Sequence, residues 1–135
     1  MDLPILVDSN IYIGLLRRGH DPVSVLFEHY ETTNLVTCGI IRLEVLRGVR
    51  MQKTWDRVSA FMDVMQYVEA DPLLWSEATA IAVRTDRKGT PIPGTAAIIA
   101  ACAFRKGASV LTEDKDFSRI NGLPILSLPS GLWDL

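Results

Sequence analysis

The 135-residue sequence has few of the residues that build soft metal centres or disulfide frameworks. It contains two cysteines, Cys38 and Cys102, each in an apolar stretch, and two isolated histidines, His20 and His29. Neither a Cys-x-x-Cys pair nor a zinc-like Cys/His spacing is present, which excludes the common zinc motifs. We therefore expect two reduced thiols in the core of a cytoplasmic protein.

The sequence also lacks a large excess of charge and a long apolar run. The net charge is −2 and the isoelectric point is near 5.6, so overall charge does not indicate a nucleic-acid-binding protein. The 14 lysines and arginines can still form a local basic surface. No apolar run approaches the roughly 18 residues of a membrane span, and no secretion leader is apparent. We expect one domain over residues 1–135, in the cytoplasm and without a membrane span.

Short apolar runs alternate with helical patterns along the chain. The apolar runs predict buried strands within residues 4–10, 34–39, 66–71, 108–114 and 123–128. Helical spacing and capping residues predict the intervening helices. The first ends near Arg18, and the others span residues 21–30, 40–50, 52–65, 71–88 and about 95–106. This alternation predicts an α/β fold in which helices cover both faces of a parallel sheet.

Carboxylates follow the apolar runs at three places. Asp8 ends the first run, where an N-cap of the next helix is the ordinary interpretation. Glu44 lies on an apolar helix face after the second run, so it is either solvated at the edge of that face or held by a cation. Asp114 and Asp116 follow the fourth run, where a polar turn is common.

The carboxyl ends of parallel strands meet at one edge of a sheet, so Asp8, Glu44 and Asp114 are expected there together. Carboxylates gathered in one place repel each other unless they are protonated or bridged by a cation. Mg²⁺ or Mn²⁺ prefers oxygen ligands of this kind. Such a metal can bind a phosphate oxygen and activate an attacking water.

Four stretches carry a resemblance to a known family: ILVDSNIYIGLL, CGIIRLEVLRG, PIPGTAAIIAACA and VLTEDKDF. Their order and approximate spacing resemble those of the PIN-domain family, and most closely the VapC-type toxins of bacterial toxin–antitoxin pairs. The resemblance spans essentially the whole chain. It implies a three-layer α/β/α fold around a central parallel sheet of four or five strands. It also implies an endoribonuclease that depends on Mg²⁺ or Mn²⁺, forms a homodimer, is inhibited by a small antitoxin and acts on RNA such as tRNA or rRNA.

The resemblance also assigns roles to individual residues. Three acids match the metal-binding and catalytic acids of the family: Asp8, Glu44 and Asp114. Supporting or substrate-binding positions are matched by Ser9, Asn10, Thr112 and Asp116. The family usually has a further Asp three residues before its Ile-Ala-Ala sequence, and this chain has Ala96 there. We therefore predict that the chain folds but cleaves RNA poorly or not at all.

The sequence is compatible with several alternatives. The alanine fits either a substitution introduced to silence a growth-arresting nuclease or a natural loss of catalysis. In the second case the chain is a non-catalytic PIN domain that binds an antitoxin or RNA. A receiver or a haloacid-dehalogenase-like phosphatase also places Asp at strand ends. However, that phosphatase normally has Asp-x-Asp after the first strand, where this chain has Asp8-Ser9-Asn10.

Two surfaces have more than one interpretation. The helices at 23–30 and 58–65 carry large apolar residues that fit either the core or an antitoxin groove: Phe27, Tyr30, Phe61 and Met65. Basic residues beside the expected site or at the ends of the later helices fit either solvated helix ends or a phosphate-binding rim: Arg17, Arg18, Arg42, Arg47, Arg50, Arg84, Arg87, Lys88, Arg105 and Lys106.

Overall fold

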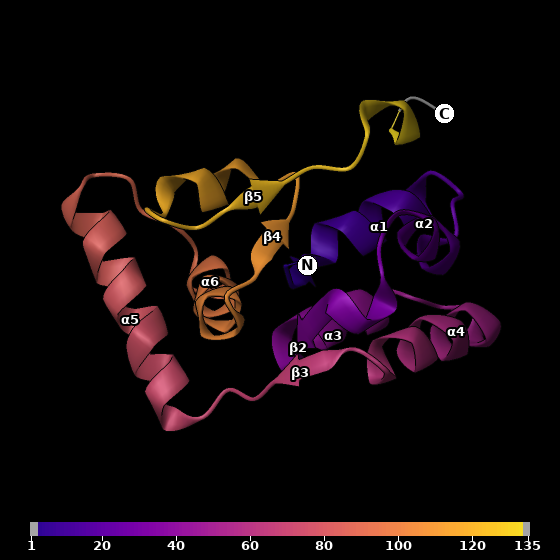
Figure 1. The fold of residues 1–135 in the computed structure, drawn as a ribbon, viewed down its shortest axis with the longest axis horizontal. Helices are drawn as coiled ribbons and strands as arrows, with labels where there is room; N and C mark the ends of the chain where they lie inside the picture. The colour runs from indigo at the N-terminus through magenta and orange to yellow at the C-terminus, as the bar shows by residue number, and fades with distance from the viewer. Residues whose placement is uncertain (1–2, 134–135) are drawn as a thin grey trace.

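A five-stranded sheet forms the centre of the computed structural model, which describes residues 3–133 (Figure 1). The strands are β1 (Ile5–Val7), β2 (Leu35–Cys38), β3 (Gln66–Val68), β4 (Ser109–Leu111) and β5 (Ile125–Leu126). They lie in the order β3-β2-β1-β4-β5, and every neighbouring pair is parallel. The predicted parallel sheet of four or five strands is therefore confirmed.

Within residues 3–133, six α-helices connect the strands. They are α1 (Ser9–Arg17), α2 (Pro22–His29), α3 (Gly39–Leu46), α4 (Gln52–Asp63), α5 (Pro72–Arg87) and α6 (Gly94–Lys106). Short 3-10 segments occur at Thr32–Asn34, Lys115–Arg119 and Ser130–Leu132. The first four helices pack together, α1 on α2 and α3, and α4 on α2 and α3, while α5 packs along α6. Figure 1 shows these two groups on opposite sides of the sheet, which gives the three expected layers.

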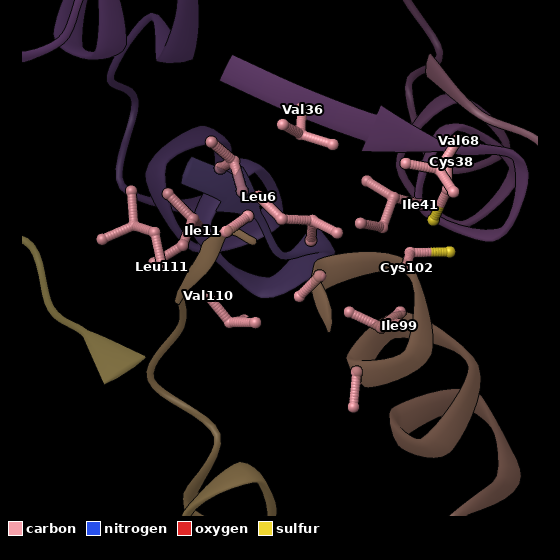
Figure 2. Close-up of a cluster of buried hydrophobic side chains, with 14 of the residues drawn as sticks. Leu6, Ile11, Val36, Cys38, Ile41, Val68, Ile99, Cys102, Val110 and Leu111 are labelled. Atoms are coloured by element: carbon pink, nitrogen blue, oxygen red, sulfur yellow. The ribbon is translucent and has the colours of Figure 1, made fainter. Parts of the chain in front are cut away.

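The central strands are short and apolar because both faces of the sheet are covered. Their most deeply buried side chains have no exposed surface: Leu6, Val7, Leu35, Val36, Val110 and Leu111. Figure 2 shows part of this cluster, in which side chains of α1 and α6 meet those of the strands. The edge strand β5 is partly exposed at Ile125 and Leu126. Within residues 3–133, every helix is too short or too polar to span a bilayer.

Helix α6 is buried along most of its length, from Ala96 to Ala103. Small side chains on all its faces allow it to lie between the sheet and α5. The helix ends at Gly107, whose left-handed backbone (φ 61°) suits a residue without a side chain. It begins at Gly94, within one residue of the predicted start, and its N-cap is Pro93, whereas Thr95, a residue type that can cap a helix, lies inside it.

One further expectation is wrong. The helix predicted to continue to Arg50 ends at Leu46, because the chain turns at Gly48, a residue of low helix propensity. Among the apolar residues that fit either the core or a groove, Phe27 lies outside the core, since 70% of its surface is exposed. Phe61 and Met65 are buried as expected, and so are the free cysteines Cys38 and Cys102.

The topology places a switch point at the centre of the sheet. The chain moves outward from β1 to β2 and β3 on one side, and then returns to β4 on the other side of β1. The carboxyl ends of β1 and β4 lie side by side, where the amide of Asp8 donates to the carbonyl of Leu111 at 3.0 Å. Open parallel sheets bind their ligands at this kind of position.

Candidate functional site

Asp8 is the central acid of this edge, and only 4% of its surface is exposed. Its Oδ1 accepts a hydrogen bond from the Ser9 amide at 2.8 Å, so Asp8 is the N-cap of α1. Its Oδ2 accepts another hydrogen bond from the Thr112 hydroxyl at 2.8 Å. The capping role and a role in an acidic site therefore coexist in one side chain.

Ser9 connects Asp8 to the second acid. The Ser9 hydroxyl lies 3.5 Å from Asp8 Oδ1 and donates to Glu44 Oε1 at 3.2 Å. This contact joins α1 to α3, two helices that pack against each other. Glu44 is half-buried, and its carboxylate is turned toward Asp8 rather than left at the edge of an apolar face.

Thr112 organises the loop after β4. Besides donating to Asp8, its hydroxyl accepts hydrogen bonds from Asn10 Nδ2 at 3.1 Å and from the Asp114 amide at 2.9 Å. Asp114 Oδ1 in turn accepts from the Asp116 amide at 2.9 Å. Asp116 also lies 3.3 Å from Arg119, so part of its charge is neutralised within the loop.

The acids influence one another electrostatically. Burial raises the pKa of Asp8 above its ordinary value, while the hydrogen bonds from Thr112 and Ser9 act in the opposite direction. The negative charges of Glu44 and Asp114 raise this pKa further. A carboxylate in this position therefore has an unfavourable charge that a bound cation would offset.

Ala96 lies in the first turn of α6, a turn that contains no acidic residue. Because α6 leads directly into β4, its first turn lies toward the carboxyl edge of the parallel sheet. Ala96 is buried and presents only a methyl group there. The first turn of a helix favours a negative side chain, so the backbone itself is compatible with an acid.

The donor chemistry fits a hard divalent cation, but the ligand set is incomplete. Within the part of the chain that the structure describes, no three acidic, histidine or cysteine side chains lie close enough to form a metal-ligand set by themselves. Asp8 and Glu44 meet through Ser9, and Asp114 joins them through its electrostatic effect on Asp8. Oxygen ligands of this type suit Mg²⁺ or Mn²⁺.

Sequence patterns did not indicate the contact that covers this loop. Trp133 Nε1 donates to Glu113 Oε1 at 3.2 Å, and the Trp133 carbonyl accepts from Arg18 Nε at 2.9 Å. The Arg18 guanidinium also lies over the indole ring, 5.0 Å from its centroid. This contact joins the 3-10 turn near the C-terminus to α1, and no hydrophobic periodicity marks such a lone tryptophan.

Some of the arginines expected at a phosphate rim have partners within the chain. Arg42 forms an ion pair with Asp63 at 2.8 Å, and Arg18 is held by Trp133. Arg105, near the end of α6, pairs with Asp71 at 2.8 Å. These three side chains therefore contribute to packing between helices in the folded chain.

Comparison with known proteins identifies the family. The family model of the PIN domain matches residues 5–123, and the chain belongs to this family. Ribonuclease VapC4 of Mycobacterium tuberculosis is 28% identical over 129 residues, which cover 91% of this chain and 95% of the relative.

Solved structures share the fold. The DNA-bound VapBC of Salmonella typhimurium matches with a TM-score of 0.76 and 22% identity, over 93% of this chain and 98% of that chain. VapC20 of M. tuberculosis, a sarcin–ricin loop cleaving toxin, matches with a TM-score of 0.63 and 18% identity, over 84% of this chain and 92% of that chain. The α/β/α architecture predicted from the sequence is therefore that of VapC structures.

Proposed function

We propose that this chain is the toxin of a toxin–antitoxin pair and has the scaffold of a metal-dependent endoribonuclease. The observation that carries the proposal is the hydrogen-bonded group of Asp8, Ser9, Glu44 and Thr112 at the switch point of a PIN-domain sheet. The similarity to Ribonuclease VapC4 over nearly the whole of both chains supports the same function.

In this proposal Asp8, Glu44 and Asp114 would hold Mg²⁺ or Mn²⁺, which when bound supplies a Lewis acid and an activated water. Ser9 and Thr112 orient Asp8 by donating to its two carboxylate oxygens. Asn10 braces the loop after β4 through Thr112. Structured RNA is the proposed substrate, and the sarcin–ricin loop specificity of VapC20 makes ribosomal RNA the first one to test beside tRNA.

Ala96 is the reason to expect impaired cleavage in this chain. A metal held by three carboxylates instead of four has less compensating charge, and its water is held less firmly. The same alanine favours a second candidate function, a PIN domain that binds an antitoxin or RNA without cleaving it. The two candidates share the fold and differ in whether the remaining acids form a competent site.

Restoring the acid separates these candidates. Ala96→Asp is compared with the unchanged chain and with Ala96→Asn, which has nearly the same size as Asp but no charge. The assay measures cleavage of ribosomal RNA fragments and tRNA with and without Mg²⁺ or Mn²⁺. We expect metal-dependent cleavage by Ala96→Asp, at least about 100-fold above the other two proteins. Metal-bound Ala96→Asp that does not cleave would support the binding module.

The proposed antitoxin site is a groove between α2 and α4. It is lined by residues of both helices: Val23, Ser24, Phe27, Ala60, Phe61 and Val64. Phe27 and Val64 are largely exposed, and an ion pair between Arg57 and Asp21 at 2.7 Å joins the two helices beside it. An amphipathic antitoxin helix would cover these apolar side chains. The VapBC complexes among the solved structures support a protein partner of this kind.

We also propose that two copies of the chain form a homodimer. Leu43, Tyr67 and Trp75 line one pocket and are 59%, 53% and 57% exposed. Exposed apolar side chains that lie together indicate an interaction surface.

A further inference from the structure

The two cysteines lie against each other in the core although they are far apart in the sequence. Cys38 ends β2 and is the N-cap of α3, whereas Cys102 lies in the middle of α6. In Figure 2 the two sulfur atoms lie near each other between these elements, in agreement with the interaction of the two side chains. Both are free thiols, 2% and 1% exposed. The fold thus brings together two thiols that do not belong to a Cys-x-x-Cys motif.

The two thiols have different chemical environments. The amides of Ile40 and Ile41, in the first turn of α3, form no capping hydrogen bond with Cys38, but they act to lower the pKa of its thiol, while burial and the charge of Asp8 act to raise it. A hydrogen bond with the Cys102 thiol is the largest influence lowering the pKa of Cys38. The same interaction, together with burial, raises the pKa of Cys102. These directions favour the thiolate at Cys38 and the neutral thiol at Cys102.

A pocket connects Cys38 to the surface. The pocket has a volume of about 340 Å³, and its lining includes Cys38, Gly39, Tyr67, Trp75 and Thr95. It lies between the start of α3 and the starts of α5 and α6. A small neutral oxidant therefore has a path to Cys38, whereas Cys102 does not line this pocket.

We propose that Cys38 and Cys102 form a peroxide-sensitive pair that closes to an intramolecular disulfide. The Cys38 thiolate attacks a peroxide oxygen, so that an S–O bond forms, the O–O bond breaks and the leaving hydroxide takes up a proton to become water. The Cys102 sulfur, after losing its proton, then attacks the sulfenic sulfur of Cys38. The S–S bond forms as the S–O bond breaks, and the hydroxide leaves as water. Two thiols and one hydrogen peroxide thus give one disulfide and two waters.

The disulfide would join the β2–α3 junction covalently to α6. Glu44 lies on α3 and Ala96 on α6, so the cross-link fixes the two elements that border the acidic site. The proposal concerns the thiols alone and does not depend on ribonuclease activity.

The test uses the complete chain, at a concentration where light scattering gives the 15.0 kDa mass of the monomer. The protein is treated with hydrogen peroxide, quenched, denatured, alkylated with iodoacetamide and analysed by intact mass spectrometry. We expect a mass about 2 Da below that of the reduced chain before alkylation, because disulfide formation removes two hydrogens and leaves neither thiol free to react with iodoacetamide. Digestion without reductant should then yield a peptide pair linked through Cys38 and Cys102.

Two single variants distinguish the roles of the thiols. Cys102→Ala should stop at a Cys38 sulfenic acid that dimedone traps, and Cys38→Ala should leave Cys102 alkylatable, with oxidation slower by about tenfold or more. Circular dichroism melting verifies that each variant is folded. If an alanine variant does not fold, the corresponding serine variant, Cys38→Ser or Cys102→Ser, is used in its place. The proposal is overturned if peroxide leaves both thiols of the unchanged chain alkylatable, or if Cys38→Ala oxidises as fast as the unchanged chain.

Discussion

At the scale of single residues, Asp8 is both a helix cap and a buried charge near other acids. Asn is as good an N-cap as Asp, so Asp8→Asn keeps the cap and removes the charge. Because the pKa of Asp8 is raised in the folded chain, its ionised form destabilises that state at neutral pH. We expect removal of the charge to stabilise Asp8→Asn at pH 7 without divalent metal by about 1.4 kcal/mol for each unit by which the pKa is raised. A pH-independent cost is subtracted from this gain, because an Asn NH2 group in place of Oδ2 cannot accept the hydrogen bond from Thr112.

The sign of this effect fixes its pH dependence. Below the ordinary Asp value of 3.8, Asp8 is protonated in both folded and unfolded states, so the advantage of Asp8→Asn disappears there. The advantage grows as pH rises from that value through the raised pKa. Urea unfolding at several pH values measures it, and added Mn²⁺ should stabilise the unchanged chain more than the variant. An advantage that is the same at pH 3 and pH 7 would contradict this account.

Two buried threonines near the carboxyl ends of strands provide a matched comparison. Thr112 has three hydrogen-bond partners, whereas the Thr37 hydroxyl has none within residues 3–133. Replacement by valine retains the shape and removes the hydroxyl. Thr112→Val should lower the free energy of unfolding by about 1–3 kcal/mol. The reason is that Asp8, Asn10 and the Asp114 amide each lose the Thr112 hydroxyl as a hydrogen-bond partner. Thr37→Val should be neutral or stabilising, since no hydrogen bond is lost.

Urea unfolding of both valine variants checks this contrast. Thr112→Ser is the control, because it retains the hydroxyl and should recover most of the loss. Equal destabilisation by Thr112→Val and Thr37→Val would show that the hydrogen bonds around Thr112 contribute little to stability.

At the scale of elements, α1 and the 3-10 turn Ser130–Leu132 are coupled through a close approach at Gly14. A Cβ atom added at Gly14 would lie 2.9 Å from Cζ3 of Trp133. Gly14→Ala gains up to about 1 kcal/mol of helix propensity but displaces the indole. We therefore expect a small net change in stability, together with greater exposure of Trp133.

Tryptophan fluorescence measures this displacement in a background where Trp55 and Trp75 are replaced by phenylalanine. The emission should shift to longer wavelength, and acrylamide should quench it more efficiently. Gly48→Ala is the matched control, because its added Cβ meets only the carbonyl of Val45 at an ordinary 3.7 Å. An unchanged Trp133 spectrum in Gly14→Ala would mean that α1 shifts instead.

Most elements could be predicted from the sequence because local rules govern them. Apolar runs predicted the strands, and Asp21-Pro22 and Asp71-Pro72 correctly marked the starts of α2 and α5. Parallel topology was enough to expect Asp8 near Glu44, which the contact through Ser9 confirms. The position of Trp133 and the exposure of Phe27 depend on long-range packing, which no spacing rule contains. The shortened α3 reflects a turn around Gly48 that competes with helical periodicity.

At the scale of the whole molecule, residues 3–133 form two apolar surfaces on different elements. One is the groove between α2 and α4 with Phe27, and the other includes Leu43, Tyr67 and Trp75. If the first surface binds an antitoxin helix and the second binds another copy of the chain, a charge introduced on the first should weaken only antitoxin binding. A charge on the second should weaken only dimer formation. Introducing glutamate at the centre of an apolar interface disrupts it, because the charge is desolvated without a partner.

Light scattering tests this division without the antitoxin. The unchanged chain should form a dimer of about twice its 15.0 kDa mass, and Trp75→Glu should shift it to monomer by weakening association about 100-fold or more. Phe27→Glu should remain dimeric, because its side chain belongs to the other surface. Since both side chains are exposed, both variants should retain the circular dichroism spectrum of the unchanged chain. A monomeric Phe27→Glu beside a dimeric Trp75→Glu would assign self-association to the groove between α2 and α4, where an antitoxin helix would then compete with the second copy.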